Sequence, residues 1–328
     1  MPSGRRREID TAKGIGILLV VLCHAISPVM KNNVIMNNVY GFIYTFHMPL
    51  FFFLAGVVAP INKKDKKKQT CSKIERLMIP YFAWAIIYSP LKIMFADLAR
   101  NAVQIPWWSL LLGNNPDGEL WFLYVLFLLS LVVIWCLNEN NKRILLVLAL
   151  IITFFSPLFS SKYAFPGISL SFSCYQIGFY ALGIYCSARW EAACNWIQKK
   201  NVSLASFVIC TLYGAMIQRG GYWWIKSAVT IVSIIFLMSM SIRLSKSNGK
   251  ISGALDYLGC HSMEIYIIHA PILIIGRKVL PHYVGKNWGY VIVLTTLAVV
   301  LSLIIDKCIL NRWQWMGRLL VGKKCKED

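Results

Sequence analysis

The chain has 328 residues, of which 57% are hydrophobic and only 15% are charged. A soluble protein carries about 25% charged residues, so this chain has too little charge to cover a surface exposed to water, and we expect a lipid bilayer around it. The net charge of +20 would suit a nucleic-acid partner. The basic residues, however, fall in short clusters between long uncharged runs, as in the loops of membrane proteins. We therefore predict that the chain does not bind nucleic acid.

Ten apolar segments follow one another along the chain, and about 20 apolar residues suffice to cross a bilayer core as a helix. The sequence thus predicts an all-α, polytopic protein with about ten transmembrane helices. The predicted segments are 13–30, 39–60, 77–97, 120–138, 143–161, 172–188, 202–218, 222–242, 258–280 and 288–307. The connections are short, so we expect one membrane domain over 1–328, with its helices within about 10–310 and a basic cytoplasmic tail over 311–328.

The distribution of Lys and Arg predicts the orientation of these helices. If the N-terminus is inside, 25 of the 34 basic residues lie in segments that face the cytoplasm, and the loop 63–68 is the densest of them. This excess predicts that both termini are cytoplasmic and that the protein is a multi-pass protein of the inner or plasma membrane. The first apolar run lacks a small-residue cleavage site, so we expect a retained helix rather than a cleaved signal peptide. The tail combines aromatic and basic residues, which suits contact with acidic membrane lipids.

The ten cysteines include no C-x-x-C pair, and most of them lie in or beside apolar runs. Cysteine in such a setting behaves as a small hydrophobic residue. We therefore predict neither a disulfide framework nor a metal site.

Ionisable residues inside a bilayer are costly, which makes them candidates for function. Of the five histidines, His24, His47 and His269 fall within predicted helices. A rise of about 1.5 Å per residue, counted from the predicted helix ends, places all three in the outer half of the membrane core. Each is either part of a site or a histidine hydrogen-bonded between helices. The shared depth favours a functional role most for His24.

Lys13 and His24 are eleven residues apart, which is almost three whole turns at about 3.6 residues per turn, so both side chains face the same way. Lys13 lies at the cytoplasmic edge, and His24 lies about 16 Å further along the helix. Asp10 is near enough in sequence to pair with Lys13. One stripe therefore joins a cation that attracts phosphate to a potential general base, although a membrane-flanking lysine beside a packed histidine would give the same pattern.

Two further patterns carry charge at predicted helix ends. Lys73 and Arg76 form a K-x-x-R pair at the inner start of segment 77–97, where they either contact phosphate groups or simply flank the membrane. Glu119 directly precedes segment 120–138. We interpret it as a carboxylate that stabilises a helix N-terminus, and the alternative is a place at the outer mouth of a site.

Four stretches together resemble the acyltransferase-3 family of membrane enzymes. The first two are the specific ones: residues 10–24, DTAKGIGILLVVLCH, and residues 46–56, FHMPLFFFLAG. The other two, LWFL at 120–123 and EIYIIH at 264–269, are weaker alone. The resemblance spans about residues 8 to 310, and the D-x-x-K-G opening looks closest to the branch of fucose 4-O-acetylase and related acetyltransferases.

This resemblance implies a ten-helix enzyme that transfers an acyl group, usually acetyl, from cytoplasmic acyl-CoA to a sugar or lipid of the cell envelope. By position, His24 matches the essential histidine of the family's first helix. Lys13 stands where many relatives have arginine, and Lys73 and Arg76 match an R-x-x-R motif with lysine in its first position. Both departures keep the positive charge and lose the planar guanidinium fork.

The resemblance thus predicts a membrane-embedded O-acetyltransferase, with acetyl-CoA as donor and a cell-surface polysaccharide or its lipid-linked precursor as acceptor. We expect His24 to be catalytic, with His47, His269 and Glu119 as candidate supporting residues. His24 either takes a proton from the acceptor hydroxyl or accepts the acetyl group itself. A transporter or flippase of a sugar-linked or small solute remains the alternative, because buried histidines also serve proton relays, although no broken helix pair is apparent. The acceptor's identity and a homo-oligomeric state stay open.

Overall fold

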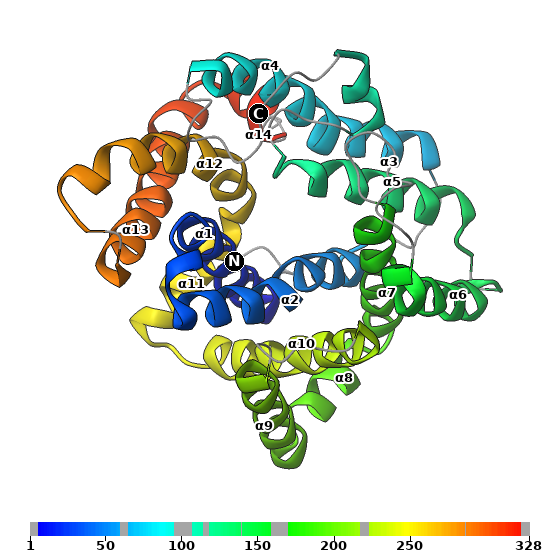
Figure 1. Cartoon of the computed structure of the whole chain (residues 1–328). Helices are drawn as coiled ribbons and strands as arrows, with labels where there is room; N and C mark the ends of the chain where they lie inside the picture. The colour runs from blue at the N-terminus through cyan, green and yellow to red at the C-terminus, as the bar shows by residue number, and fades with distance from the viewer. Residues whose placement is uncertain are drawn as a thin grey trace. The chain divides into compact units, whose positions relative to one another are not determined.

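The computed structural model describes residues 6–59, 65–94, 107–113, 118–138, 140–158, 170–216, 223–285 and 287–322, and within these ranges it contains helices and turns but no strand (Figure 1). The all-α prediction is confirmed. The helices are α1 (Arg7–Ile26), α2 (Val34–Val57), α3 (Lys66–Lys73), α4 (Ile79–Met94), α5 (Trp121–Cys136), α6 (Lys142–Phe155), α7 (Leu170–Ser187), α8 (Trp190–Ile197), α9 (Lys200–Met216), α10 (Trp223–Ser245), α11 (Lys250–Cys260), α12 (Ser262–Val279), α13 (Trp288–Ile305) and α14 (Gln314–Val321).

Every predicted apolar segment overlaps one of these helices, but not all of the helices have spanning length. Within the described ranges, four helices are long and apolar enough to cross a membrane: Arg7–Ile26, Val34–Val57, Ile225–Ser245 and Trp288–Leu310. A fifth candidate is the pair α11 and α12, bent by 79° at a short break. The protein is therefore a multi-pass membrane protein by its apolar helices, and the count of ten stays a prediction.

Several helices have different boundaries from those predicted, and the first and ninth predicted segments are two examples. The first helix begins at Arg7, six residues before the predicted segment 13–30, and ends at Ile26. Its C-cap residue is Ser27, and the following Pro28 has no backbone N–H to continue the helical hydrogen bonds. The predicted segment 258–280 begins inside α11, and the chain turns at His261, which is the C-cap residue of that helix.

The chain divides into two compact units, each built from separated stretches of sequence. The first comprises residues 1–58, 178–262 and 286–295, and the second comprises 59–177, 263–285 and 296–328. Helices α7 and α13 contribute residues to both units. The single membrane domain predicted from the sequence stays a prediction.

In the first unit, α1 packs directly against α11, and the two helices lie side by side in Figure 1. A Cβ atom added at Gly14 would overlap the backbone carbonyl of Leu255, and one added at Gly259 would overlap the carbonyl of Asp10. The helices thus touch through their backbones at two glycines, a close approach that small residues permit in membrane proteins. The D-x-x-K-G opening is therefore also a packing motif.

The first turns of α1 are fixed by polar side chains of the same unit. The Arg7 guanidinium pairs with the Asp256 carboxylate and donates to Ser252 Oγ at 3.0 Å. On another face, Trp190 Nε1 donates to Glu8 Oε1 at 2.7 Å. These contacts explain why the helix begins well before its apolar run, since they order polar residues that would otherwise fray.

In α2, Pro49 interrupts the helical hydrogen bonds because proline has no backbone N–H. The carbonyl four residues earlier, that of Thr45, thereby loses its helical donor. The hydroxyl of Thr230 on α10 lies 3.1 Å from this oxygen, and it also lies 2.8 Å from the carbonyl of Lys226 in its own helix. A buried side chain from another helix thus donates to the carbonyl that has no helical donor because of Pro49. In a bilayer interior, backbone polar groups need such a partner within the protein.

In the second unit, α3 continues through a π-helical turn, η2 (Ile74–Met78), into α4. Helix α14 packs on both η2 and α4, and Figure 1 shows it in red beside α4 in cyan. Trp84 Nε1 of α4 donates to the Leu320 carbonyl at 2.8 Å, which fixes the end of α14.

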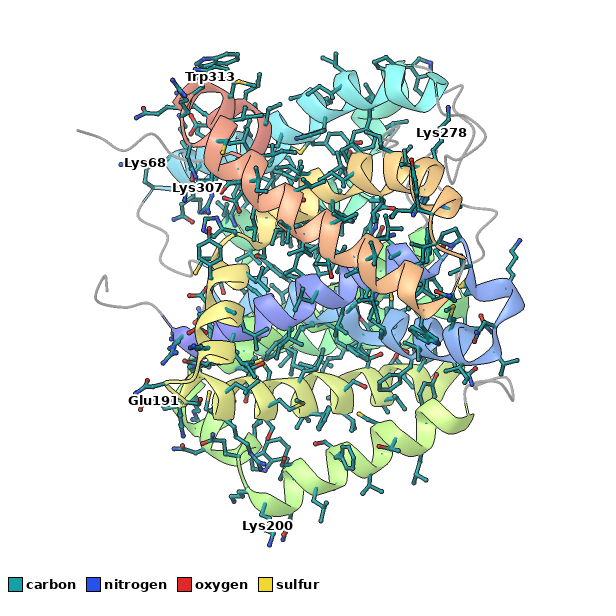
Figure 2. All side chains as sticks on the ribbon, turned by 90° about the vertical axis from the view of Figure 1, so that its left-hand side faces the viewer. Lys68, Glu191, Lys200, Lys278, Lys307 and Trp313 are labelled. Atoms are coloured by element: carbon teal, nitrogen blue, oxygen red, sulfur yellow. The ribbon has the colours of Figure 1, made fainter. Side chains whose placement is uncertain are left out.

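Figure 2 shows where charged residues lie along the second unit. Lys68 and Lys307 lie near one end together with Trp313, and Lys278 lies near the opposite end. Lys68, in the basic loop predicted to be cytoplasmic, thus shares one end of this unit with Lys307. That this end faces the cytoplasm stays a prediction.

Candidate functional site

Helix α1 carries Lys13 and His24 on one unbroken helix of 20 residues, so the stripe inferred from their spacing exists. Lys13 Nζ lies 4.0 Å from Asp10 Oδ1, and both side chains are partly buried, at 29% and 12% exposed. The Asp10–Lys13 pair is therefore present. It holds the ammonium group at the first turns of α1, three helical turns from His24.

His24 lies in the last turn of α1, two residues before the helix ends. The sequence placed it about six residues from a helix end, so the helix ends closer to His24 than predicted. Its depth in the membrane stays a prediction. The side chain is half-buried, and the neighbouring Cys23 thiol lies 4.0 Å from the Tyr40 carbonyl of α2. The negative end of a helix dipole favours positive charge, which suits a histidine that takes up a proton.

The side chain of His47 contacts residues of its own helix, α2. Its side chain is 2% exposed, and its Nδ1 lies 2.9 Å from the Ile43 carbonyl one turn earlier. The ring also packs on Tyr44, with 5.1 Å between ring centroids. These contacts fit a histidine that packs α2, and its supporting role in a site stays a prediction.

In the second unit, Glu119 and His269 form a pair, with Oε2 and Nε2 3.2 Å apart. His269 is fully buried, and its Nδ1 lies 2.6 Å from the Tyr266 carbonyl and 3.1 Å from that of Ile265. A carbonyl only accepts, so Nδ1 must carry a proton, and Nε2 is the atom that faces the carboxylate. A hydrogen bond between Nε2 and Oε2 then requires a proton between these two atoms.

The helix-capping interpretation of Glu119 is wrong. The N-cap residue of α5 is Leu120, and the first turn of that helix contains no acidic residue. Instead, the Tyr266 hydroxyl donates to the Glu119 backbone carbonyl, and its ring packs on Phe122 with 5.5 Å between centroids. The stretches 120–123 and 264–269, distant in sequence, thus meet in one unit. Tyr266 is a residue that sequence reasoning missed, although it stands within the EIYIIH stretch.

Lys73 ends α3, and Arg76 lies three residues later in the π-helical turn η2. Burial lowers the pKa of Lys73 from its ordinary value of 10.5, and the positive charge of Arg76 lowers it further. The two cations are thus close enough to repel each other, a strain that a bound polyanion would relieve. Single π-helical turns occur frequently at functional sites.

Comparisons with known proteins give one match to a family and two to curated relatives. The model of the acyltransferase-3 family, described as an acyltransferase domain, matches residues 6–307. The nodulation protein NolL of Mesorhizobium japonicum is 26% identical over 223 residues, which cover 63% of this chain and 56% of that protein. NolL of Sinorhizobium fredii is 26% identical over 186 residues, covering 52% and 49%. The chain thus spans about half the length of the curated relatives it matches, and no solved structure matches it.

Proposed function

Because the chain belongs to the acyltransferase-3 family, we propose that it is a membrane-embedded O-acetyltransferase. The acetyl group moves from cytoplasmic acetyl-CoA to a hydroxyl of a cell-surface polysaccharide or its lipid-linked precursor. The observation that carries this proposal is the family match over residues 6–307, which includes every candidate site residue. One domain of ten spans in the inner or plasma membrane, with both termini in the cytoplasm, belongs to the same proposal.

His24 is the proposed catalytic residue. In one route its imidazole takes the proton of the acceptor hydroxyl while the oxygen attacks the thioester carbonyl; the C–S bond breaks, and the proton passes to the thiolate of CoA. In the other route the imidazole attacks the thioester carbonyl and the C–S bond breaks, which releases CoA as the thiolate. The acceptor hydroxyl then takes the acetyl group from the imidazole, and its proton passes to the thiolate. Both routes need a histidine on the donor's path, and its place on α1 beyond Lys13 supports this role.

Lys13, Lys73 and Arg76 are the proposed acyl-CoA-binding residues. Support comes from the paired cations of the α3–η2 turn and from the partly buried ammonium group of Lys13. Lysine supplies point charge to phosphate and arginine supplies a planar fork. The donor binds without a metal in this proposal.

Glu119 and His269 are proposed as supporting residues, and their direct pairing is what supports them. The carboxylate of Glu119 can orient the imidazole of His269 within the site. His47 has the weakest support of the candidates, because its Nδ1 is used within α2. An exposed aromatic residue, Trp108, suits a sugar ring near the predicted outer mouth.

One observation favours a second candidate function. Helices α11 and α12 form a broken pair bent by 79°, a feature that the sequence alone did not reveal. Broken helices line the substrate sites of many secondary transporters. A transporter or flippase of a sugar-linked or small solute is therefore the alternative, and its transport would continue without acetyl-CoA.

The proposal is tested by deleting the gene in its host and following O-acetyl signals in purified surface polysaccharides by proton NMR. We expect the deletion to remove one signal, wild type to restore it, and His24→Ala to restore less than about one hundredth of it, since general acid–base catalysis contributes at least about 100-fold. Immunoblots establish equal protein levels. Full restoration by His24→Ala would refute the catalytic assignment. Unchanged acetyl signals after deletion, together with solute uptake that needs no acetyl-CoA, would favour the transporter.

The two catalytic routes are separated by mass spectrometry of the purified protein after incubation with acetyl-CoA and no acceptor. An acetyl group recovered on His24 supports the covalent route. An unmodified protein that still transfers acetyl when acceptor is added supports direct transfer.

A further inference from the structure

Helix α14 lies beyond residues 6–307, which the family model matches, yet it packs on the turn that carries Arg76. It is a helix of eight residues, and its N-cap residue, Trp313, lies near the end of the second unit that also holds Lys68 and Lys307 (Figure 2). Within this unit α14 packs on α4, on η2 and on the π-helical turn η8 (Asp306–Leu310), and η2 holds the second cation of the K-x-x-R pair. This position gives α14 a direct influence on a proposed binding group.

The end of α14 abuts the backbone of Arg76. Gly322 is the C-cap residue of the helix and has a left-handed backbone, with φ of +64°. A Cβ atom added there would lie 2.6 Å from the Cα atom of Arg76 and 2.7 Å from its carbonyl oxygen. Only glycine meets both requirements, positive φ and this close approach. The contact therefore limits how far the backbone of the π-helical turn can move.

The side chain of Arg318 forms an ion pair with Glu75, the residue that precedes Arg76. Arg318 Nη2 donates to Glu75 Oε1 at 2.8 Å, and the two side chains are 53% and 43% exposed. Glu75 stands between Lys73 and Arg76 in sequence, so its carboxylate adds a negative charge to the segment that carries the proposed phosphate-binding cations. Because Arg318 forms an ion pair with the Glu75 carboxylate, the positive charges of Lys73 and Arg76 stay available to a bound anion.

The attachment of α14 does not depend on this ion pair. The Leu320 carbonyl accepts from Trp84 Nε1 at 2.8 Å, and Trp84 is 7% exposed. Gly317 and Val321 are buried as well. A change at Arg318 alone should therefore alter the charge near Glu75 and leave the helix in place.

We propose that α14 is a positioning element of the acyl-CoA phosphate site: its glycine end fixes the backbone at Arg76, and Arg318 neutralises Glu75. This inference rests on the proposed function, because it assumes that Lys73 and Arg76 bind acyl-CoA. Arg318 and Gly322 are positioning residues, since they act on the cations and not on the donor itself.

The test is acetyl-CoA binding to the purified full chain in lipid nanodiscs by isothermal titration calorimetry. Removing Arg318 leaves the negative charge of Glu75 without its partner. If a bound phosphate group lies within about 6 Å of that charge, binding in water weakens roughly three- to fivefold. We expect that loss for Arg318→Gln, little loss for Arg318→Lys, and recovery to within about twofold for the double variant Arg318→Gln with Glu75→Gln. Arg312→Gln, which removes the same charge before α14 begins, is the matched control.

Recovery by the second substitution is a result that mere unfolding of α14 would not give. In turnover assays the change should appear in KM and not in kcat. If wild type binds acetyl-CoA and Lys73→Gln weakens it, but Arg318→Gln binds like wild type, the inference about α14 is overturned and the proposed function stands. If wild type does not bind acetyl-CoA, both are overturned. If Arg312→Gln weakens binding as much as Arg318→Gln, general charge attraction replaces the specific role of Arg318.

Discussion

Replacing Gly14 by alanine should loosen the contact between α1 and α11. The added methyl group meets the Leu255 carbonyl, which belongs to the backbone and cannot rotate away, so the two helices must separate. Overpacking of this kind costs about 1–3 kcal/mol. Alanine also favours a helix over glycine by about 1 kcal/mol. We therefore expect a net loss of up to about 2 kcal/mol in the free energy of unfolding.

The chain offers matched comparisons on the partner helix. Gly259 meets the Asp10 carbonyl in the same way, so Gly259→Ala should destabilise the protein to a similar extent. Gly253 lies in α11 too, but a Cβ atom there meets nothing within 4 Å. Gly253→Ala should thus stabilise by about 0.5–1 kcal/mol through helix propensity alone. The double variant Gly14→Ala with Gly259→Ala should cost less than the sum, because one separation of the helices relieves both overlaps.

Thermal unfolding of the purified protein in nanodiscs, followed by tryptophan fluorescence, measures these differences. A loss of about 2 kcal/mol lowers the unfolding temperature by roughly 3 °C in a chain of 328 residues, because the entropy of unfolding is about 2.1 cal/mol/K per residue. The reasoning fails if Gly14→Ala unfolds at or above the temperature of wild type. It also fails if Gly253→Ala is destabilised as much as Gly14→Ala, since only one of these positions touches another helix.

Three further changes probe other contacts. Thr230→Val removes the hydroxyl beside the carbonyl that Pro49 leaves without a donor, and should lower the free energy of unfolding by about 1 kcal/mol; chemical denaturation measures it, with Thr230→Ser as control. Because burial and Arg76 lower the pKa of Lys73, acetyl-CoA affinity should fall as pH rises toward 10.5, and it should fall less in Lys73→Arg. Glu119→Gln removes the charge beside the buried histidine of α12 and should lower kcat by about 10-fold or more, measured with saturating acetyl-CoA, whereas Glu119→Asp should retain more activity.

Each of these expectations has an opposing result. Equal unfolding free energies for Thr230→Val and Thr230→Ser would show that the hydroxyl does not serve the α2 carbonyl. Because the pKa of Lys73 is lower in the folded protein, the unfolded chain binds more protons between that pKa and 10.5. The contribution of Lys73 to the free energy of unfolding therefore rises with pH in this interval. A binding profile that is flat across that interval would remove Lys73 from the donor site. Full activity of Glu119→Gln would leave the carboxylate with a structural role only.

The sequence by itself determined the features that depend on local order. Low charge and long apolar runs are enough to specify helices in a bilayer, because a spanning segment must satisfy its own backbone hydrogen bonds. Helical periodicity likewise placed Lys13 and His24 on one stripe, since both belong to a single helix. The family resemblance read from residues 10–24 and 46–56 agrees with the family match over residues 6–307.

Boundaries were less accurate because they depend on contacts with other segments. Helix α1 extends to Arg7 since Asp256 and Trp190 hold its first turns. The break at His261 could not be inferred from hydropathy, which stays apolar through the following helix.

Only the tertiary structure brought together groups that are far apart in the chain. The carboxylate of Glu119 reaches His269 and not the first turn of α5, and Arg318 reaches Glu75. Periodicity says which way a side chain points from its own helix, but not which helix stands opposite. The neighbour of each helix depends on how the helices pack together. Gly14 of α1 and Gly259 of α11 are an example, because their role as contact points is evident only from the position of the partner backbone.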